Sequence, residues 1–523
     1  MLDLLIKSGL VMDGTGNQGY PAAVGVEGET VRILRRDVSS VQAAKTIDAT
    51  GMVVCPGFID MHAHSGLMAL HQPRHEPKVR QGVTTELIGV DGISYAPLPT
   101  PEDFDSLLLL NAGLDGSPPL PRRWSTVAEY LSLFDDRVAC NFAYLIGNSA
   151  LRISTMGWDD RRPTGEELET MRSLVRQGME EGAFGISTGL TYPPGGYADT
   201  SELVELSREV ARLGGIYVTH VRYTLGDQFL DPYREAIEIG RQSGVAVHIS
   251  HLHNPRPGGA RRLLALVDDA LLEGLDVTYD SYSYPYSSSR MEAVLPDWAH
   301  DGGPDRLLEL MRSPEGRRRM AESLTVRAPS WDAVLVTNFS RPHNQRWDGK
   351  SLAAIAEGLG KSIIDTLCDL LLEEEMRLSY VILGGNPLNI REFFRHPAHM
   401  VGSDALLFGD HVNPRSYGCF PLVLGDFVRE EQVLELAQAI RKMTSFPAQR
   451  LGLHDRGILR DGMKADIVVF DPRTVRANAT LAEPCRYPDG IEYVVVNGKT
   501  VVEKGQHTGR LPGRALRYSA GGR

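Results

Sequence analysis

Two histidines separated by one residue follow a strand-like segment near the start of the chain. His62 and His64 come after the apolar run 52–55 and a short connection. Alternate residues of an extended strand point to the same side, so the two imidazoles converge on one point. A divalent metal needs that convergence, and neutral imidazole suits zinc. The pair alone is equally compatible with two ordinary histidines, so other residues must decide between the two hypotheses.

Metal-binding residue types also follow four other strand-like segments. An aspartate or a histidine stands at the end of the segments 84–90, 216–221, 245–251 and 399–404. A single histidine at a strand end is more often a hydrogen-bonded structural residue, but ligand types at the same end of five strands are hard to explain without a metal. We therefore predict one or two divalent metal ions, with zinc as the expected element. The predicted ligands are His62, His64, Asp91, His220, His251 and Asp404.

This set of ligands predicts a hydrolase. Zinc lowers the pKa of a bound water from ~16 towards ~7, which makes hydroxide available at neutral pH, and it also polarises a substrate carbonyl. A carboxylate beside the metal, Asp404, would take the proton from that water and then give it to a leaving nitrogen. The reaction that we expect is metal-assisted hydrolysis of an amide or a related C–N bond.

The central part of the chain predicts an α/β barrel. Eight strand-like segments alternate with helix-patterned ones, as in a (β/α)8 TIM-type barrel, whose active site lies at the C-terminal ends of the strands. A doubly wound sheet would use similar units, but no phosphate-binding G-x-G-x-x-G follows the first strand. The predicted strands are 52–60, 84–90, 141–147, 184–189, 216–221, 245–251, 276–282 and 399–404, and the predicted helices include 164–181, 200–213, 231–243 and 261–273.

Both ends of the chain have a different pattern, with short β-type runs and turns. Residues 1–55 and 450–523 are therefore predicted to form one small β-sandwich domain, and the Asn497-Gly498 pair is a strong hairpin signal there. Residues 56–449 form the predicted metallohydrolase barrel. An interval of about 285–344 interrupts the alternation of strands and helices, and we expect an insertion that covers the site as a lid.

Composition excludes several classes of function. The chain has 523 residues, of which 42% are apolar and 23% charged, as in an ordinary globular protein of more than one domain. The net charge of -12 argues against nucleic acid or an anionic membrane as a partner, which leaves a small-molecule substrate. Five dispersed cysteines, no leader-like start and no long apolar run predict a cytoplasmic protein. A homo-oligomer is left open.

One motif points to another mechanism. Residues 185–189 match the G-x-S-x-G pattern of a serine nucleophile, with Ser187 at its centre. That motif needs a helix directly after the turn, whereas the following residues 193–196 are Pro-Pro-Gly-Gly, which will not start one cleanly. We therefore expect Ser187 to face a loop over the pocket, and we disfavour the serine-hydrolase hypothesis.

Several longer motifs make the chain resemble a known family. The stretch 56–64 and the Gly402-Ser403-Asp404 motif are typical of the amidohydrolase superfamily, and later stretches resemble its N-acyl-D-amino-acid deacylase (D-aminoacylase) group. The resemblance extends over nearly the whole chain. Its further motifs are 81–85, 185–189 with 192–194, 219–222, 249–251, 441–444 and 465–472.

This resemblance implies a distorted (β/α)8 barrel, a terminal β-sandwich, a lid inserted after the seventh strand, and zinc as the metal. It also implies that His220 and His251 hold the tighter metal, while His62, His64 and Asp404 line a weaker second site, with Asp404 as general base and acid. The implied activity is hydrolysis of the amide bond of an N-acylated amino acid of D configuration, or of a related acyl-amine.

The chain departs from the group at four positions near the metals and the substrate. Asp91 stands where the group has a zinc-binding cysteine, and Asn148 stands where it often has a histidine. His253 replaces a lysine that helps to bind the substrate carboxylate, and Asn413 replaces a histidine before residues 414–415. Because an aspartate is a harder and shorter ligand than a thiolate, the number and identity of the metals stay open, and we predict a shifted substrate.

Three functional hypotheses fit these residues. The first is the hydrolase of N-acylated amino acids, and the second is a cyclic-amide or other C–N hydrolase of the same superfamily, which the change to His253 favours. The third is a catalytically silent binding protein on the same fold. An arginine fork suits a substrate carboxylate. The predicted substrate-binding residues are Tyr192, Arg222, His253, Tyr282, Tyr284 and Arg415.

Overall fold

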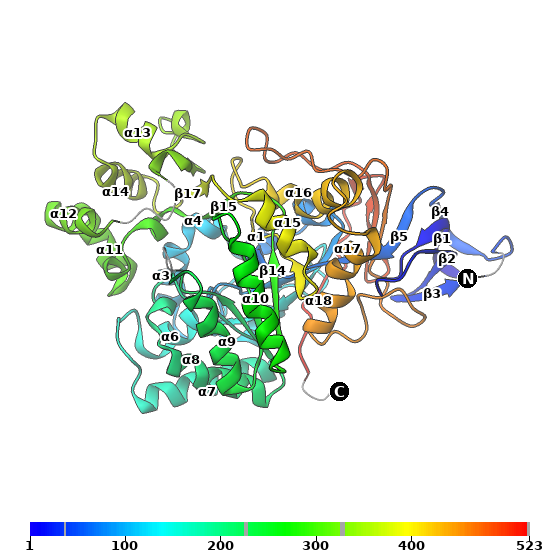
Figure 1. Ribbon diagram of the computed structural model, residues 1–523, viewed down its shortest axis with the longest axis horizontal. Helices are drawn as coiled ribbons and strands as arrows, with labels where there is room; N and C mark the ends of the chain where they lie inside the picture. The colour runs from blue at the N-terminus through cyan, green and yellow to red at the C-terminus, as the bar shows by residue number, and fades with distance from the viewer. Residues whose placement is uncertain (36–37, 224–227, 325–329, 520–523) are drawn as a thin grey trace.

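The chain folds into three parts that follow one another across the molecule (Figure 1). The computed structural model describes residues 1–35, 38–223, 228–324 and 330–519. A β-sheet unit that carries the N-terminus lies at one end, a barrel lies in the centre, and a mainly helical unit inserted into the barrel lies at the other end. The barrel is the part that positions the predicted metal ligands.

Eight parallel strand positions close into the predicted barrel. β6, β8 and β9 pair in parallel, and a six-stranded run from β10 to β18 continues from them. The first and last positions meet where Met61 N donates to Val401 O at 3.2 Å and Asp404 N donates to His62 O at 2.8 Å. The strands are β6 (Phe58–Asp60), β7 (Ala63–His64), β8 (Val83–Ile88), β9 (Asn141–Tyr144), β10 (Ile146–Gly147), β11 (Gly185–Gly189), β12 (Ile216–His220), β13 (Ala246–Ile249), β14 (Val277–Ser281), β18 (His399–Val401) and β19 (Ala405–Leu406).

Helices alternate with these strands and cover the barrel. In α7 a Thr164 cap and Glu167 form a capping box, and Met171, Val175 and Met179 recur every four residues on the buried face. The four predicted helices are present as α7 to α10, which pack side by side. The covering helices are α6 (Asn148–Met156), α7 (Gly165–Glu180), α8 (Thr200–Arg212), α9 (Asp231–Ser243), α10 (Gly259–Leu272), α15 (Pro387–Arg395), α16 (Arg415–Leu422), α17 (Leu436–Met443) and α18 (Ser445–Arg450).

Strands from both ends of the chain form the β-sheet unit, as predicted. The link between the two ends is β5, which pairs in parallel with β1 and antiparallel with β20. All nine strands belong to one hydrogen-bonded sheet, so the expected sandwich is built from a single sheet in which β1 has three partners. The strands are β1 (Leu2–Val11), β2 (Tyr20–Glu27), β3 (Thr30–Leu34), β4 (Ala43–Asp48), β5 (Val53–Pro56), β20 (Ile467–Phe470), β21 (Ile491–Val496), β22 (Lys499–Glu503) and β23 (Gln506–His507).

The end of the chain does not stay in this sheet. We expected residues 450–523 to belong to the β unit, but Gly513 forms a β-bridge with Val138, and Ala515 forms one with Phe142 of the barrel. Burial of apolar side chains explains why the chain end lies against the barrel. Ala515 and Leu516 are buried in clusters that include the barrel residues Phe142 and Ala143.

The inserted unit lies between β14 and β18 and has its own hydrophobic core. Its sheet has the order β15–β17–β16, and Met291, Leu307 and Leu371 are buried in its core. The expected insertion ended near residue 344, whereas the structure continues it to Ile382 because β17 is the central strand of the sheet. Its elements are β15 (Ser287–Arg290), α11 (Gly303–Arg312), α12 (Pro314–Ser323), β16 (Val334–Thr337), α13 (Leu352–Leu359), α14 (Ile363–Glu373) and β17 (Ser379–Ile382).

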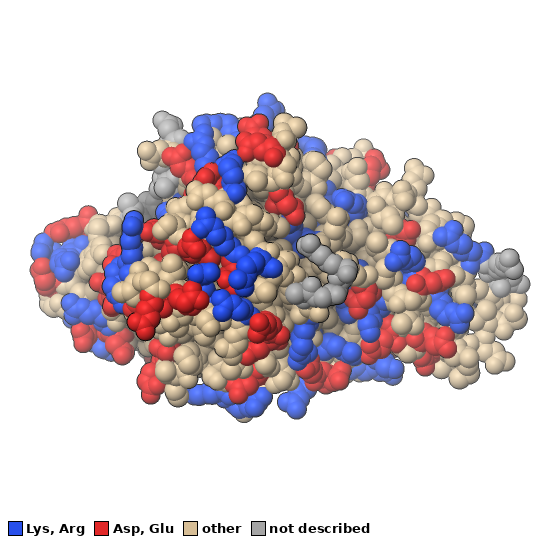
Figure 2. Space-filling model, turned by 90° about the horizontal axis from the view of Figure 1, so that it is seen from below, with Lys and Arg blue, Asp and Glu red and all other residues tan. Residues whose placement is uncertain are grey.

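The surface and the helices limit the kinds of partner. On the face shown in Figure 2, basic and acidic side chains are intermingled, and neither sign forms a continuous field there. Nucleic acid binding through phosphates requires such a basic field. In the part of the chain that the structure describes, no helix has both the length and the apolar character required to cross a membrane.

Candidate metal centre

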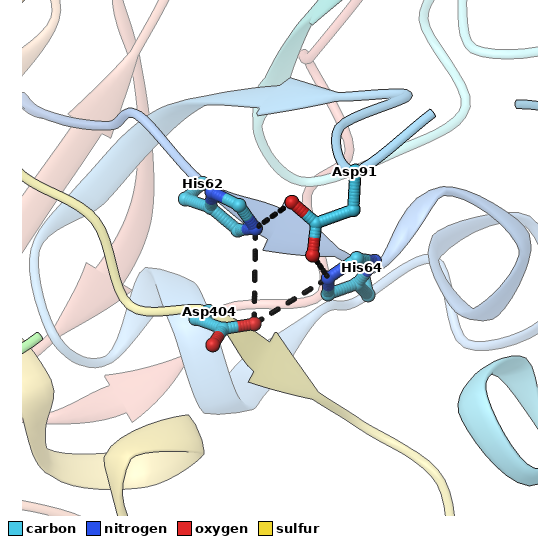
Figure 3. A group of neighbouring side chains, drawn as sticks. All are labelled: His62, His64, Asp91 and Asp404. Carbon is cyan, nitrogen blue, oxygen red and sulfur yellow. Dashed lines mark ion pairs between the residues drawn. The ribbon is translucent and has the colours of Figure 1, made fainter. Parts of the chain in front are cut away.

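His62 and His64 leave the first barrel position with their Nε2 atoms on the same side (Figure 3). His62 Nε2 lies 3.4 Å from Asp91 Oδ1 and 3.7 Å from Asp404 Oδ1. His64 Nε2 lies 3.4 Å from Asp91 Oδ2 and 3.4 Å from Asp404 Oδ1. These four buried side chains therefore surround one point with two imidazoles and two carboxylates.

A second group of ligand atoms shares Asp91 with the first. His220 Nδ1 lies 3.5 Å and His251 Nε2 lies 3.4 Å from Asp91 Oδ2, and the two imidazole nitrogens are 3.0 Å apart. The structure thus brings all six predicted ligands together at the C-terminal ends of the barrel strands. Asp91 is the one residue common to both groups.

The geometry and chemistry of these groups fit zinc ions. With metal–ligand bonds of about 2.0–2.2 Å, the ligand atoms of a tetrahedral zinc lie ~3.4 Å apart, which matches the separations given above. Both ring nitrogens of His62 and the Oδ1 atom of Asp91 are buried without a hydrogen-bond partner among the described residues. Buried polar atoms are normally paired, so a cation held by His62 Nε2 and Asp91 Oδ1 would satisfy both of these atoms, while His62 Nδ1 faces Asp280.

Backbone conformation directs three of the ligands into the centre. Asp91 (φ 56°), His251 (φ 31°) and Asp404 (φ 50°) are in the left-handed region, which is strained for residues other than glycine. Two glycines flank Asp91, and a side chain at Gly89 would collide with the Leu145 carbonyl. The tight turn after β8 therefore aims the Asp91 carboxylate at the histidines.

Electrostatics keep the two carboxylates ionised. Burial raises the pKa of Asp91, but the imidazoles of His62, His251 and His220 outweigh it and hold that pKa well below its ordinary value. Burial also raises the pKa of Asp404, but the Arg415 guanidinium and the neighbouring histidines outweigh this effect and hold that pKa below its ordinary value. Both carboxylates are therefore charged at neutral pH, as metal ligands must be.

The histidines differ from one another. Burial lowers the pKa of His220 to about 4, so this imidazole is neutral and has a free lone pair. Burial has the same effect on His62 and His64, but Asp91 with Asp280 or Asp404 outweighs it and raises their pKa values. Metal binding at His62 and His64 would consequently release protons.

Asp280 orients two of the ligands, and the sequence analysis missed it. Its carboxylate lies 3.7 Å from His62 Nδ1, accepts from His251 N at 2.9 Å, and pairs with His248 Nε2 at 2.9 Å. Carboxylates that hold the second nitrogen of a metal-binding imidazole fix its orientation. The available signal was an aspartate within the predicted strand 276–282.

A buried charge network holds the first and last strands in register below the ligands. Asp60 Oδ1 accepts from His62 N at 3.1 Å and from Ser403 N at 2.8 Å. The ammonium group of Lys78 binds the Asp60 carboxylate, donates to Ser403 Oγ at 2.7 Å and lies 3.2 Å from Glu86 Oε1. Asp60, Lys78 and Glu86 are fully buried. No sequence pattern indicated that Lys78 and Glu86 take part.

A cavity of ≈ 480 Å³ opens beside the metal groups, and three of the predicted substrate-binding residues line it. These residues are Tyr192, His253 and Tyr282. The Tyr192 ring lies 4.6 Å from the His220 ring, and its hydroxyl is 3.2 Å from Ser289 Oγ of the inserted unit. The insertion thus contributes one wall of the cavity, through Ser287, Ser288, Ser289, Tyr380 and Ile382, which the sequence analysis left unassigned.

The other three predicted substrate residues are engaged elsewhere. Arg222 donates to Gly196 O at 2.6 Å and to Ala198 O at 2.7 Å, and pairs with Glu235, so it braces a loop. Tyr284 donates to Ala479 O at 3.1 Å. Neither of these two residues lines the cavity.

Arg415 is fully buried behind the cavity wall. Its guanidinium binds Asp404 Oδ2 at 2.6 Å, donates to Ser288 Oγ at 3.0 Å, and lies 4.1 Å from the Tyr282 ring centre. Its first role is therefore to hold and charge-stabilise Asp404.

Ser187 does not have the surroundings of a nucleophile. Its hydroxyl is buried, donates to Gly89 O and accepts from Gly92 N at 3.0 Å. Both partners belong to the turn that carries Asp91, so Ser187 faces a loop as expected and fixes the turn that positions this ligand.

Comparisons with known proteins agree with the geometry. The model of the "Amidohydrolase family" matches residues 45–292 and 345–502, and its gap falls in the inserted unit. N-acyl-D-glutamate deacylase of Alcaligenes xylosoxydans xylosoxydans is 36% identical over 99% of this chain and 97% of that protein, and its D-aminoacylase is 34% identical over 99% and 98%. The crystal structure of N-acyl-D-glutamate deacylase from Bordetella bronchiseptica, with zinc and a phosphonate mimic of the tetrahedral intermediate, matches with a TM-score of 0.84 and 33% identity, covering 99% of this chain and 100% of that chain.

Removal of the shared ligand should change metal content. We expect Asp91→Asn to bind at least one zinc ion per chain fewer than the wild-type protein, because Asp91 belongs to both groups of ligand atoms. Elemental analysis of the purified protein after dialysis measures this. Asp115→Asn is a matched control, since Asp115 is buried next to Tyr95 and belongs to neither group. A zinc content of the Asp91→Asn variant equal to that of the wild-type protein would contradict the assignment.

Removal of the buried lysine should destabilise the fold. Lys78→Met leaves the Asp60 and Glu86 carboxylates buried without their cation, so we expect the free energy of unfolding to fall by about 3–5 kcal/mol. The double variant Lys78→Met/Glu86→Gln removes one charge of each sign and should recover only part of that loss, because the Asp60 carboxylate still lacks its cation. Urea unfolding of both variants checks this. Equal stability of the single and double variants would show that Glu86 is not a partner of Lys78.

Proposed function

This chain belongs to the amidohydrolase family, and from that membership and the geometry of the metal centre we propose that it hydrolyses the amide bond of N-acylated D-amino acids. The observation that carries the proposal is the six-ligand centre at the C-terminal ends of the barrel strands, in which Asp91 is shared. The similarity to N-acyl-D-glutamate deacylase and D-aminoacylase over their full lengths supports the substrate class. The intact ligand set argues against a silent binding protein.

The chemistry is divided between the zinc ions and Asp404. Zinc, when bound, lowers the pKa of a water to about 7 and polarises the substrate carbonyl. Asp404 lines the cavity 3.4 Å from His64 Nε2, so its carboxylate is placed to accept the proton of the attacking water and to deliver it to the leaving nitrogen. Arg415 fixes the orientation of the Asp404 carboxylate during both transfers.

The proposal also assigns the end of the cavity that binds the substrate α-carboxylate. Tyr282 and Ser288 line the cavity, and the Arg415 guanidinium lies directly behind both of them. A planar guanidinium with hydroxyl groups in front of it suits a carboxylate. Tyr192 and His253 remain proposed substrate contacts, and Arg222 and Tyr284 leave the set because their polar groups are bound to backbone carbonyls.

The proposed location of the protein is the cytoplasm. Its five cysteines are free, and four of them are buried in the core, which suits a reducing compartment. A homo-oligomer stays a prediction, which gel filtration with light scattering would test.

Hydrolysis of paired enantiomers tests the proposed function. We expect the zinc-loaded protein to release acetate from N-acetyl-D-amino acids and not from the matching L enantiomers. Asp404→Asn should lower kcat by about 10²–10⁴-fold, because it removes the proton acceptor while keeping the shape of the side chain. Acetate release and free amine are measured for both proteins. A zinc-loaded protein that hydrolyses no N-acylated amino acid would overturn the proposal.

A further inference from the structure

Part of the cavity wall is apolar. Ile93, Leu114 and Tyr192 line the cavity and belong to one buried hydrophobic cluster, which also includes Ala293 of the inserted unit. Phe229 and Ile382 line the cavity as well. A substrate whose carbonyl lies at the metal centre would therefore meet hydrocarbon surface and uncharged hydroxyl groups, such as those of Ser288 and Ser289, with the rest of its body.

Cationic side chains are scarce at this surface. Among the described residues that line the cavity, Arg256 is the one lysine or arginine. It is exposed to solvent, and its guanidinium lies 5.9 Å from the ring centre of Phe229. A charge at that position is screened by water and does not neutralise a carboxylate held against the buried wall.

The nearest buried cation behind the wall is already compensated. The Arg290 guanidinium pairs with the Glu292 carboxylate and donates to Asn111 Oδ1 at 2.6 Å. Its carbon lies 4.7 Å from the Tyr192 ring centre, so the aromatic ring stands between this charge and the cavity space that Tyr192 lines. Arg415 is also paired, with Asp404, but it differs from Arg290 in that it donates to Ser288 Oγ of the cavity wall, and the proposed function places the α-carboxylate at that end.

We propose that the cavity selects N-acyl-D-amino acids with uncharged, apolar side chains, such as leucine, methionine or phenylalanine, over those with acidic side chains. The inference rests on the proposed function. A carboxylate on the side chain would be transferred from water to a surface without a free cation, which is strongly unfavourable, whereas a hydrocarbon side chain gains from burial there. Overall identity does not decide the question, since the N-acyl-D-glutamate deacylase and the D-aminoacylase are similar to this chain to almost the same degree.

A substrate panel tests the inference on the wild-type protein. We expect kcat/KM for N-acetyl-D-leucine, N-acetyl-D-methionine and N-acetyl-D-phenylalanine to exceed that for N-acetyl-D-glutamate and N-acetyl-D-aspartate by at least about 100-fold. N-acetyl-D-glutamine has the shape of the glutamate derivative without its charge, and it should be hydrolysed faster than the glutamate derivative. Equal or faster hydrolysis of the acidic substrates would overturn the inference and leave the proposed function standing. No hydrolysis of any member of the panel would instead overturn the proposed function.

Two substitutions test whether the apolar wall causes the preference. Ile382→Lys places an ammonium group at the cavity wall, and we expect it to raise the ratio of kcat/KM for N-acetyl-D-glutamate over N-acetyl-D-leucine by at least about tenfold. Ile382→Met is its matched control and should leave that ratio unchanged. Arg256→Ala should also leave the ratio unchanged. A fall of tenfold or more in the ratio for Arg256→Ala would identify Arg256 as a side-chain anchor and would overturn the inference.

Discussion

The metal centre depends on the hydrogen bonds that join the first barrel strand to the last. One carboxylate, Asp60, accepts from the backbone amides of both His62 and Ser403. His62 is itself a predicted ligand, and Ser403 directly precedes the predicted ligand Asp404. The two amides belong to the first and the last strand positions of the barrel. Lys78 makes this arrangement stable, because an unpaired carboxylate in a fully buried position would be strongly unfavourable. The closure of the barrel and the positions of these ligands therefore depend on the same hydrogen bonds.

A second constraint is the position of Asp91 between the two groups of ligand atoms. Its two oxygens face different histidines, and its backbone is held in the left-handed region by a turn that Ser187 fixes. The Asp91 carboxylate therefore lies within 3.5 Å of histidines of both groups. Asp91 Oδ1 and His62 Nε2 are buried without a hydrogen-bond partner among the described residues, which fits a cation between them.

The inserted unit connects the chemistry to the choice of substrate. It is built around its own hydrophobic core and its own sheet, separate from the barrel strands that hold the ligands. Ser288 of β15 and Ile382 of β17 line the cavity together with the metal groups. The barrel therefore determines the reaction, while the insertion shapes the space that receives the rest of the substrate.

The sequence alone predicted the barrel, the β unit and a group of six ligand-type side chains, because strand and helix patterns are local and these residue types stand at strand ends; the structure brings the six side chains together. Strands alternate their side chains, and parallel strands in a closed barrel bring their C-terminal ends together, so His62, His220 and Asp404 were predictable as one group. The long side chains were not predictable. Arg222 and Arg415 have the same chemistry, yet the first braces a loop and the second holds Asp404, because each guanidinium goes to partners that only the tertiary fold brings near. The same reason hid the Lys78 network and the apolar wall, since both depend on contacts between segments far apart in the sequence.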